Sequence, residues 1–84
     1  MTLQEKIDKL PLSIEYKGKL YEMNLLIYEK YVRLQYWFFP SDPYDDVEML
    51  FGCENENTLD ELSHRIEDVV DRALTIIENK EWEK

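Results

Sequence analysis

The period of the hydrophobic pattern changes once along this chain, and that change constrains the fold more than any other feature. Between residues 12 and 53, apolar residues alternate with polar ones over short segments, as they do in half-buried β-strands. Between residues 58 and 77, apolar residues recur every three or four positions, as they do on one face of a helix. Strands followed by one long helix predict an α+β domain.

The alternating part divides into four expected strands, which cover residues 12–16, 20–28, 31–39 and 47–53. The alternation is clearest in the third strand, whose apolar face would consist of Val32, Leu34, Tyr36 and Phe38. In the fourth strand, Val47, Met49 and Phe51 would share a face. Gly18 lies between the first two strands, where it can adopt the positive φ of a tight turn. The bend after the second strand has no Gly, Asn or Pro, so it is the weakest of the expected turns.

Part of this region also fits a helix. Helical spacing connects Leu20, Met23, Ile27, Tyr31 and Leu34. The high content of aromatic and β-branched residues favours strands instead. Residues 40–46 contain two prolines among Ser and Asp residues, which predicts a loop that interrupts strand pairing.

A short helix is expected at the start of the chain. Thr2 and Glu5 have the spacing of a capping box, in which each side chain bonds a free backbone N–H of the first turn. This helix would run through Leu10, because Pro11 disfavours helical geometry in the residue before it.

A long amphipathic helix is expected at the end of the chain. Thr58 and Glu61 form a second capping box, and the helix should extend to about Asn79. Its apolar stripe would consist of Leu59, Leu62, Ile66, Val69, Ala73, Ile76 and Ile77. The sequence therefore predicts a single small α+β domain over residues 1–84, with a four-stranded antiparallel sheet arranged as a meander. The long C-terminal helix would cover one sheet face, and the short helix would precede the sheet.

Acidic residues are concentrated in the second half of the chain. The formal net charge is −9, although residues 1–40 carry six Lys or Arg against five Asp or Glu. No basic residue occurs between Arg33 and Arg65. The negative electrostatic field of these acids repels nucleic acids and anionic membranes and attracts basic surfaces. With a single cysteine, no apolar run near ~18 residues and no secretory leader pattern, the expected location is the cytoplasm of the producing or host cell.

Signatures of catalysis and metal binding are weak. Cys53 and His64 could form a nucleophile–base pair only if folding brought them together with an orienting group. Cys53 is more simply interpreted as a small buried residue, and His64 as a surface residue near acids. The acidic run that includes Asp42 does not match a calcium-binding loop, because Tyr44 stands where Asp or Asn is needed. We therefore expect no enzymatic activity, no cofactor and no metal site.

Six aromatic residues between positions 31 and 44 stand beside this acidic segment, and they allow two interpretations. In the first, Tyr36 and Phe38 fill the core, and Trp37 merely flanks it. In the second, outward-facing aromatics anchor a protein partner inside an acidic rim. The candidate partner-binding residues are Tyr31, Trp37, Asp42, Tyr44, Asp45, Asp46, Glu54 and Glu56. A secondary acidic stripe on the expected long helix consists of Asp60, Glu67, Asp71 and Glu78.

The segment "GCENENTLDEL" resembles the strand-to-helix passage of HicB-type antitoxins, over about a dozen residues. Gly52, Cys53, Thr58 and Glu61 occupy the matching positions. Phe51 stands where that family has a proline, and the upstream strands do not match clearly. The resemblance is consistent with a protein that binds and neutralises another protein.

Two functions of different classes remain open at this point. The first is a non-enzymatic, acidic inhibitor that captures a basic, nucleic-acid-handling partner, of the anti-CRISPR, anti-restriction or antitoxin type. Phage-encoded inhibitors of host defence share this physical character, and one route of action is nucleic-acid mimicry. The second is a structural or adaptor domain that homodimerises through its open sheet face, with acids that serve only solubility.

Overall fold

Four consecutive strands pair antiparallel in the order β1-β2-β3-β4, in a computed structural model that describes residues 1–83. The elements are α1 (Leu3–Asp8), β1 (Ser13–Tyr16), β2 (Lys19–Ile27), β3 (Val32–Phe38), β4 (Glu48–Asn55), α2 (Leu62–Asn79) and the 3-10 helix η1 (Glu81–Glu83). The predicted α+β class, the meander and the two helices are confirmed.

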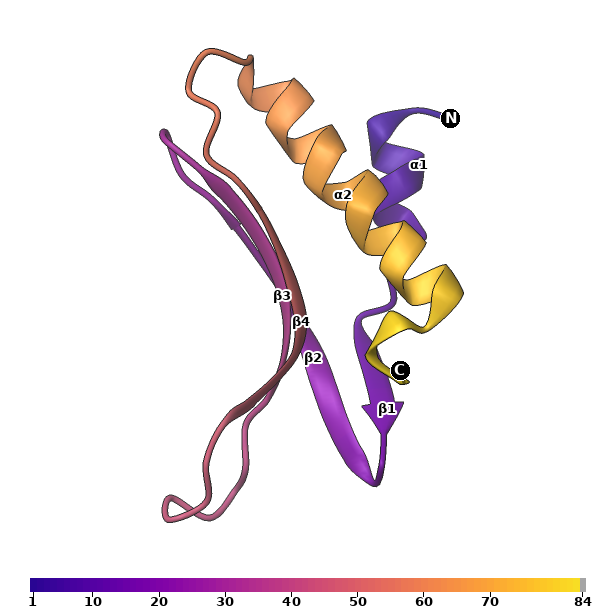
Figure 1. Cartoon of the computed structure of the whole chain (residues 1–84), viewed down its shortest axis with the longest axis vertical. Coiled ribbons are helices and arrows are strands. Elements are labelled where there is room, and N and C mark those ends of the chain that lie inside the picture. Colours follow the sequence, from indigo (N-terminus) through magenta and orange to yellow (C-terminus); the bar gives the residue numbers. More distant parts are fainter. Residues whose placement is uncertain (84) are drawn as a thin grey trace.

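Both helices lie on the same side of the sheet, as Figure 1 shows. Helix α2 packs on β3 and β4, and α1 packs against α2. We call the helix-covered face of the sheet the inner face and the opposite face the outer face. No helix or strand of residues 1–83 lies over the outer face (Figure 1). Strands β3 and β4 bend away from the helices toward the loop that joins them (Figure 1).

The core lies between β3 and α2. Val32, Leu34 and Tyr36 are fully buried on the inner face, as their alternation predicts. They meet Val69 and Ala73, which are fully buried on α2. The phenol of Tyr36 donates a hydrogen bond of 2.8 Å to the carbonyl oxygen of Pro11. Burial raises the pKa of Tyr36, because the phenolate would lose its hydration.

The two hairpin turns on either side of β2 are formed differently. Lys17 and Gly18 both have positive φ, 51° and 78°, which is the geometry of a two-residue hairpin turn. The β2–β3 turn lacks such residues and is supported from outside the hairpin. There, Nη1 of Arg65 on α2 donates to the carbonyl oxygen of Glu29 at 3.0 Å. Arg65 is only 6% exposed.

The start of the long helix differs from the prediction. Helix α2 begins at Leu62, and its N-cap residue Glu61 makes no side-chain capping bond. Instead, the side-chain oxygens of Asn55 and Asn57 accept backbone N–H bonds from residues two positions later, at 2.8 and 3.2 Å. These local bonds stabilise a turn where the capping box predicted helix. Leu59 is consequently 96% exposed and does not join the buried stripe.

A β-bulge in β4 changes which residues share a face. Tyr36 pairs with Phe51 and Trp37 pairs with Met49, so Leu50 has no cross-strand partner. Phe51 therefore lies on the inner face, where its ring stacks on Trp82 at a centroid distance of 5.7 Å. Met49 lies on the outer face beside Trp37. The prediction that Met49 and Phe51 share a face is therefore wrong, because strict alternation fails at a bulge.

Candidate protein-binding surface

The strand register arranges the outer face in rows that cross the sheet. Trp37 stands opposite Glu22 on β2 and opposite Met49 on β4. Gln35 likewise stands between Asn24 and Gly52. Residues that are directly opposite on one face lie close enough for their side chains to interact. The neighbours of Trp37 on this face are therefore the carboxylate of Glu22, the thioether of Met49 and, along its own strand, the amide of Gln35.

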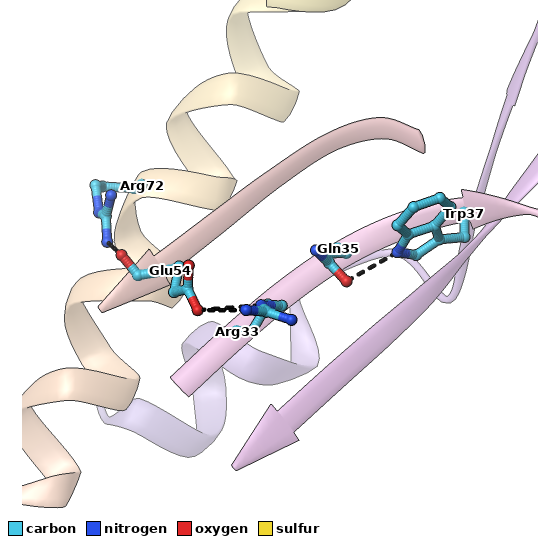
Figure 2. Close-up of polar contacts among 5 residues, drawn as sticks. All are labelled: Arg33, Gln35, Trp37, Glu54 and Arg72. Atoms are coloured by element: carbon cyan, nitrogen blue, oxygen red, sulfur yellow. Dashed lines mark hydrogen bonds and ion pairs between the residues drawn. The ribbon is translucent and has the colours of Figure 1, made fainter. Parts of the chain in front are cut away.

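At the end of the outer face farther from the β3–β4 loop, Arg33 and Glu54 form an ion pair. Nη2 and Nε of Arg33 donate to one carboxylate oxygen of Glu54, at 2.6 and 3.2 Å (Figure 2). The pKa of Arg33 is raised, chiefly by this hydrogen bond. Arg72 reaches from α2 and donates to the backbone oxygen of Glu54 at 2.7 Å (Figure 2). The charge of Glu54 is therefore balanced within the chain.

The orientation of Trp37 is held by a hydrogen bond on the same strand. Its indole N–H donates to Oε1 of Gln35 at 2.8 Å (Figure 2). The ring centroid lies 6.4 Å from that of Phe39. Gly52 leaves a hollow of about 210 Å³ beside Gln35 and Met49. A Cβ at position 52 would lie 3.1 Å from Cγ of Gln35 and 3.2 Å from Sδ of Met49.

The loop between β3 and β4 projects at the end of the molecule, away from α2 (Figure 1). Its acids Asp42, Asp45 and Asp46 are exposed, and Tyr44 is 94% exposed. None of these three carboxylates forms an ion pair with residues 1–83. Lys19 approaches the same end from the inner face, where it binds Glu48 at 2.7 Å.

The structure divides the predicted partner-binding residues into two groups. Trp37 lies on the outer face near the β3–β4 loop, and Asp42, Tyr44, Asp45 and Asp46 lie in that loop, where Asp45 and Asp46 line a hollow with Lys19 and Glu48. Tyr31, Glu54 and Glu56 belong to the opposite end, roughly 20 Å away along β3 at ~3.3 Å per residue. The Tyr31 ring packs against Tyr28 at 4.6 Å and lies under the guanidinium of Arg33 at 5.1 Å. The side chains of the second group thus largely make contacts within the chain.

The predicted acidic stripe on the long helix is also divided. Asp60 precedes α2 and lies in a turn. Glu67 and Asp71 bind Nζ of Lys6 on α1, at 3.8 and 3.0 Å. Glu78 is exposed on α2. Two of the four acids therefore serve to hold α1 against α2.

Glu22, Gln35 and Met49 belong to the surface around Trp37, and sequence reasoning did not select them. Gln35 could have been found, because it is two residues from Trp37 on the same strand. Glu22 and Met49 depend on the pairing register, and the register of β4 is shifted by the bulge.

Cys53 and His64, the two residues considered for nucleophilic chemistry, lie in different surroundings. Cys53 is buried on the inner face of β4, and burial raises the pKa of its thiol, which opposes formation of a nucleophilic thiolate. His64 is exposed in the first turn of α2. Within residues 1–83, no three His, Cys, Asp or Glu side chains are grouped so that they could hold a metal ion. None of the described helices has the length and apolar character needed to cross a membrane.

The segment that resembles HicB-type antitoxins joins β4 to α2. Gly52 and Cys53 lie in β4, with Cys53 facing the core. Thr58 lies in the exposed turn that precedes α2 and does not cap the helix. Comparisons with protein-family models, with curated proteins and with solved structures give no match to this chain.

Proposed function

We propose that this chain is a non-enzymatic inhibitor that captures a basic, nucleic-acid-handling protein through the loop end of its outer face. We define the loop-end patch as the apolar residues Trp37, Phe39, Val47 and Met49 together with the acids Glu22, Asp42, Asp45 and Asp46. Inhibition would follow because the acidic surface occupies the basic surface with which the partner binds nucleic acid. Inhibitors of CRISPR or restriction nucleases and antitoxins act on partners of this kind.

One observation carries the proposal: apolar side chains are exposed together on a sheet face that no other element covers. Phe39, Val47 and Met49 are 55%, 53% and 48% exposed. Met49 stands opposite the half-buried Trp37, and the ring centroid of Phe39 lies 6.4 Å from that of Trp37. Grouped apolar residues with a polar rim are typical of protein interaction sites, whereas isolated exposed ones are common everywhere.

The charge of the patch supports the choice of a basic partner. Its rim acids form no ion pairs with the described residues, although Asp45 and Asp46 line a hollow with Lys19. The charge of Glu22 and Asp42 is therefore available to an incoming surface. Such charges mainly accelerate association and exclude acidic partners, while buried aromatic contacts slow dissociation. The balanced Arg33–Glu54 pair at the opposite end offers much less electrostatic attraction.

Homodimerisation through the same face is the competing function. It would cover the same apolar side chains, but each copy carries a net charge of −9, and the unpaired acids of the two patches would repel. Gel filtration and light scattering over a range of protein concentration decide between them. A stable dimer in 0.15 M salt would replace the inhibitor proposal.

The test neutralises the loop acids while preserving their shape. A basic protein recovered from a lysate is identified, purified and tested by surface plasmon resonance against the parent chain and against D42N/D45N/D46N. We expect slower association and a loss of affinity that shrinks at 1 M salt, where the Debye length is ~3 Å. The partner's nuclease or nucleic-acid-binding activity should also fall when the parent chain is added.

The matched control is E78Q/E81Q/E83Q, which removes three charges from the helix side of the molecule. This control should bind the partner like the parent chain, because a change in net charge alone leaves the patch intact. Equal losses in both triple variants would contradict capture by the loop-end patch. An unaffected D42N/D45N/D46N variant at low salt would also contradict it.

A further inference from the structure

We infer that Trp37 receives an arginine side chain of the partner, with the guanidinium over the indole ring and beside Glu22. This inference rests on the proposed function, because it assigns the partner residue that the loop-end patch recognises. It places one specific contact at the centre of the patch and leaves the remaining acids as a steering rim.

The position of Trp37 in the sheet supports a docking role. It lies on β3, an internal strand, with Glu22 directly opposite on one side and Met49 on the other. Phe39 extends the apolar surface toward the loop, with its ring centroid 6.4 Å from that of Trp37. An aromatic ring on an uncovered face, with an acid beside it, combines an apolar contact with negative potential.

Arginine is the side chain that fits this combination best. A cation over an indole ring is attracted by the ring quadrupole, and tryptophan is the strongest of the aromatic acceptors. The planar guanidinium also stacks on aromatic rings and is less strongly hydrated than the ammonium of lysine. Its aliphatic stem could lie on Met49 or Phe39, while Glu22, which forms no ion pair within residues 1–83, is available to its N–H groups.

The face's own arginine is held away from this position. Arg33 is bonded to Glu54 (Figure 2), and it lies over the ring of Tyr31 at the opposite end of the face from Trp37. That arrangement is itself an arginine stacked on an aromatic ring beside a carboxylate. Trp37 and Glu22 would offer the partner the same chemistry.

The indole ring is also held in a defined orientation before binding. Gln35 accepts the indole N–H at 2.8 Å (Figure 2), and Gly52 leaves the space that the Gln35 stem and Met49 occupy. A receptor group that is already ordered loses less conformational entropy when the partner arrives.

The experiment uses capped hexa-arginine, hexa-lysine and hexa-citrulline peptides as probes with the full chain. Citrulline preserves the shape of arginine without its charge. Binding is followed in 0.15 M salt by the two tryptophan indole N–H signals in ¹H–¹⁵N NMR spectra, assigned with W82F. We expect hexa-arginine to shift the Trp37 signal and leave the Trp82 signal in place. Hexa-lysine should bind more weakly, and hexa-citrulline should produce no shift.

Tryptophan variants distinguish the arginine contact with Trp37 from the general attraction of a basic peptide to the acidic surface. W37L should weaken hexa-arginine binding about two- to thirty-fold, the range expected for one cation–π contact, and W82F should bind like the parent chain. Circular dichroism checks that W37L is folded. If it is not, the shift of the Trp37 signal in the parent chain still tests the contact, because that measurement needs no substitution.

The outcomes distinguish the two proposals. If W37L binds like the parent chain while D42N/D45N/D46N binds weakly, the arginine contact is wrong and acidic capture stands. Hexa-lysine that binds as tightly as hexa-arginine also overturns the assignment of arginine. Shifts confined to acids of α2, with no response at Trp37 or the loop, would overturn both proposals.

Discussion

At the scale of single residues, Arg65 is the clearest case of a side chain that supports the fold from a buried position. It is 6% exposed, its Nη1 donates to the carbonyl oxygen of Glu29, and its Nε has no hydrogen-bond partner. A buried cation that lacks full compensation is costly, but its bond supports a turn that has no turn-forming residues. We predict that R65K lowers the free energy of unfolding by about 1–3 kcal/mol, because lysine keeps the buried charge and loses the guanidinium geometry. R65M should cost less than R65K, because it removes the charge and keeps an apolar stem. Urea denaturation measures both variants, and R65K as stable as the parent chain would contradict this role.

At the scale of elements, the boundary of α2 determines which leucines and valines contribute to stability. Val69 is fully buried against the sheet, whereas Leu59 lies outside the helix and is almost fully exposed. We predict that V69A lowers the free energy of unfolding by about 2 kcal/mol, since it removes buried methyl groups and leaves a cavity. L59A should change it by less than about 0.5 kcal/mol, because an exposed side chain has little burial to lose. Thermal and urea denaturation of the two variants measure the difference. A large loss in L59A would mean that the helix begins earlier, as the capping box predicted.

At the scale of the whole molecule, the excess of acids acts against the compact state. The chain carries a net charge of −9 within an envelope of 40 × 25 × 22 Å, so its carboxylates repel one another. We predict that the melting temperature rises when NaCl is increased from 0.02 to 0.2 M, because the Debye length then falls to about 10 Å or less. D42N/D45N/D46N should melt higher than the parent chain at low salt, and this advantage should shrink as salt is added. Scanning calorimetry measures both effects, with sucrose as a control for solvent exclusion. A melting temperature that falls with salt would show that attractive ion pairs outweigh the repulsion.

Most of the elements could be predicted from the sequence, because their determinants are local. The alternation of Val32, Leu34 and Tyr36 depends only on the two-residue repeat of a strand. Gly18 adopts positive φ as expected, and α2 ends at Asn79 as predicted. The outward position of Trp37 also follows from this alternation, so the centre of the candidate patch was accessible from the sequence.

The tertiary structure alone decided which side chains surround Trp37 and which acids remain unpaired. Glu22 and Met49 become its neighbours through strand register, and the register near Met49 depends on a bulge that alternation does not reveal. Glu54 is balanced by Arg33 from another strand, while the loop acids have no ion-pair partner among the described residues. Arg65 is buried, and its guanidinium joins α2 to the β2–β3 turn. Local repeats and turns act over two to four residues and can be seen in the sequence, whereas these contacts join segments that only folding brings together.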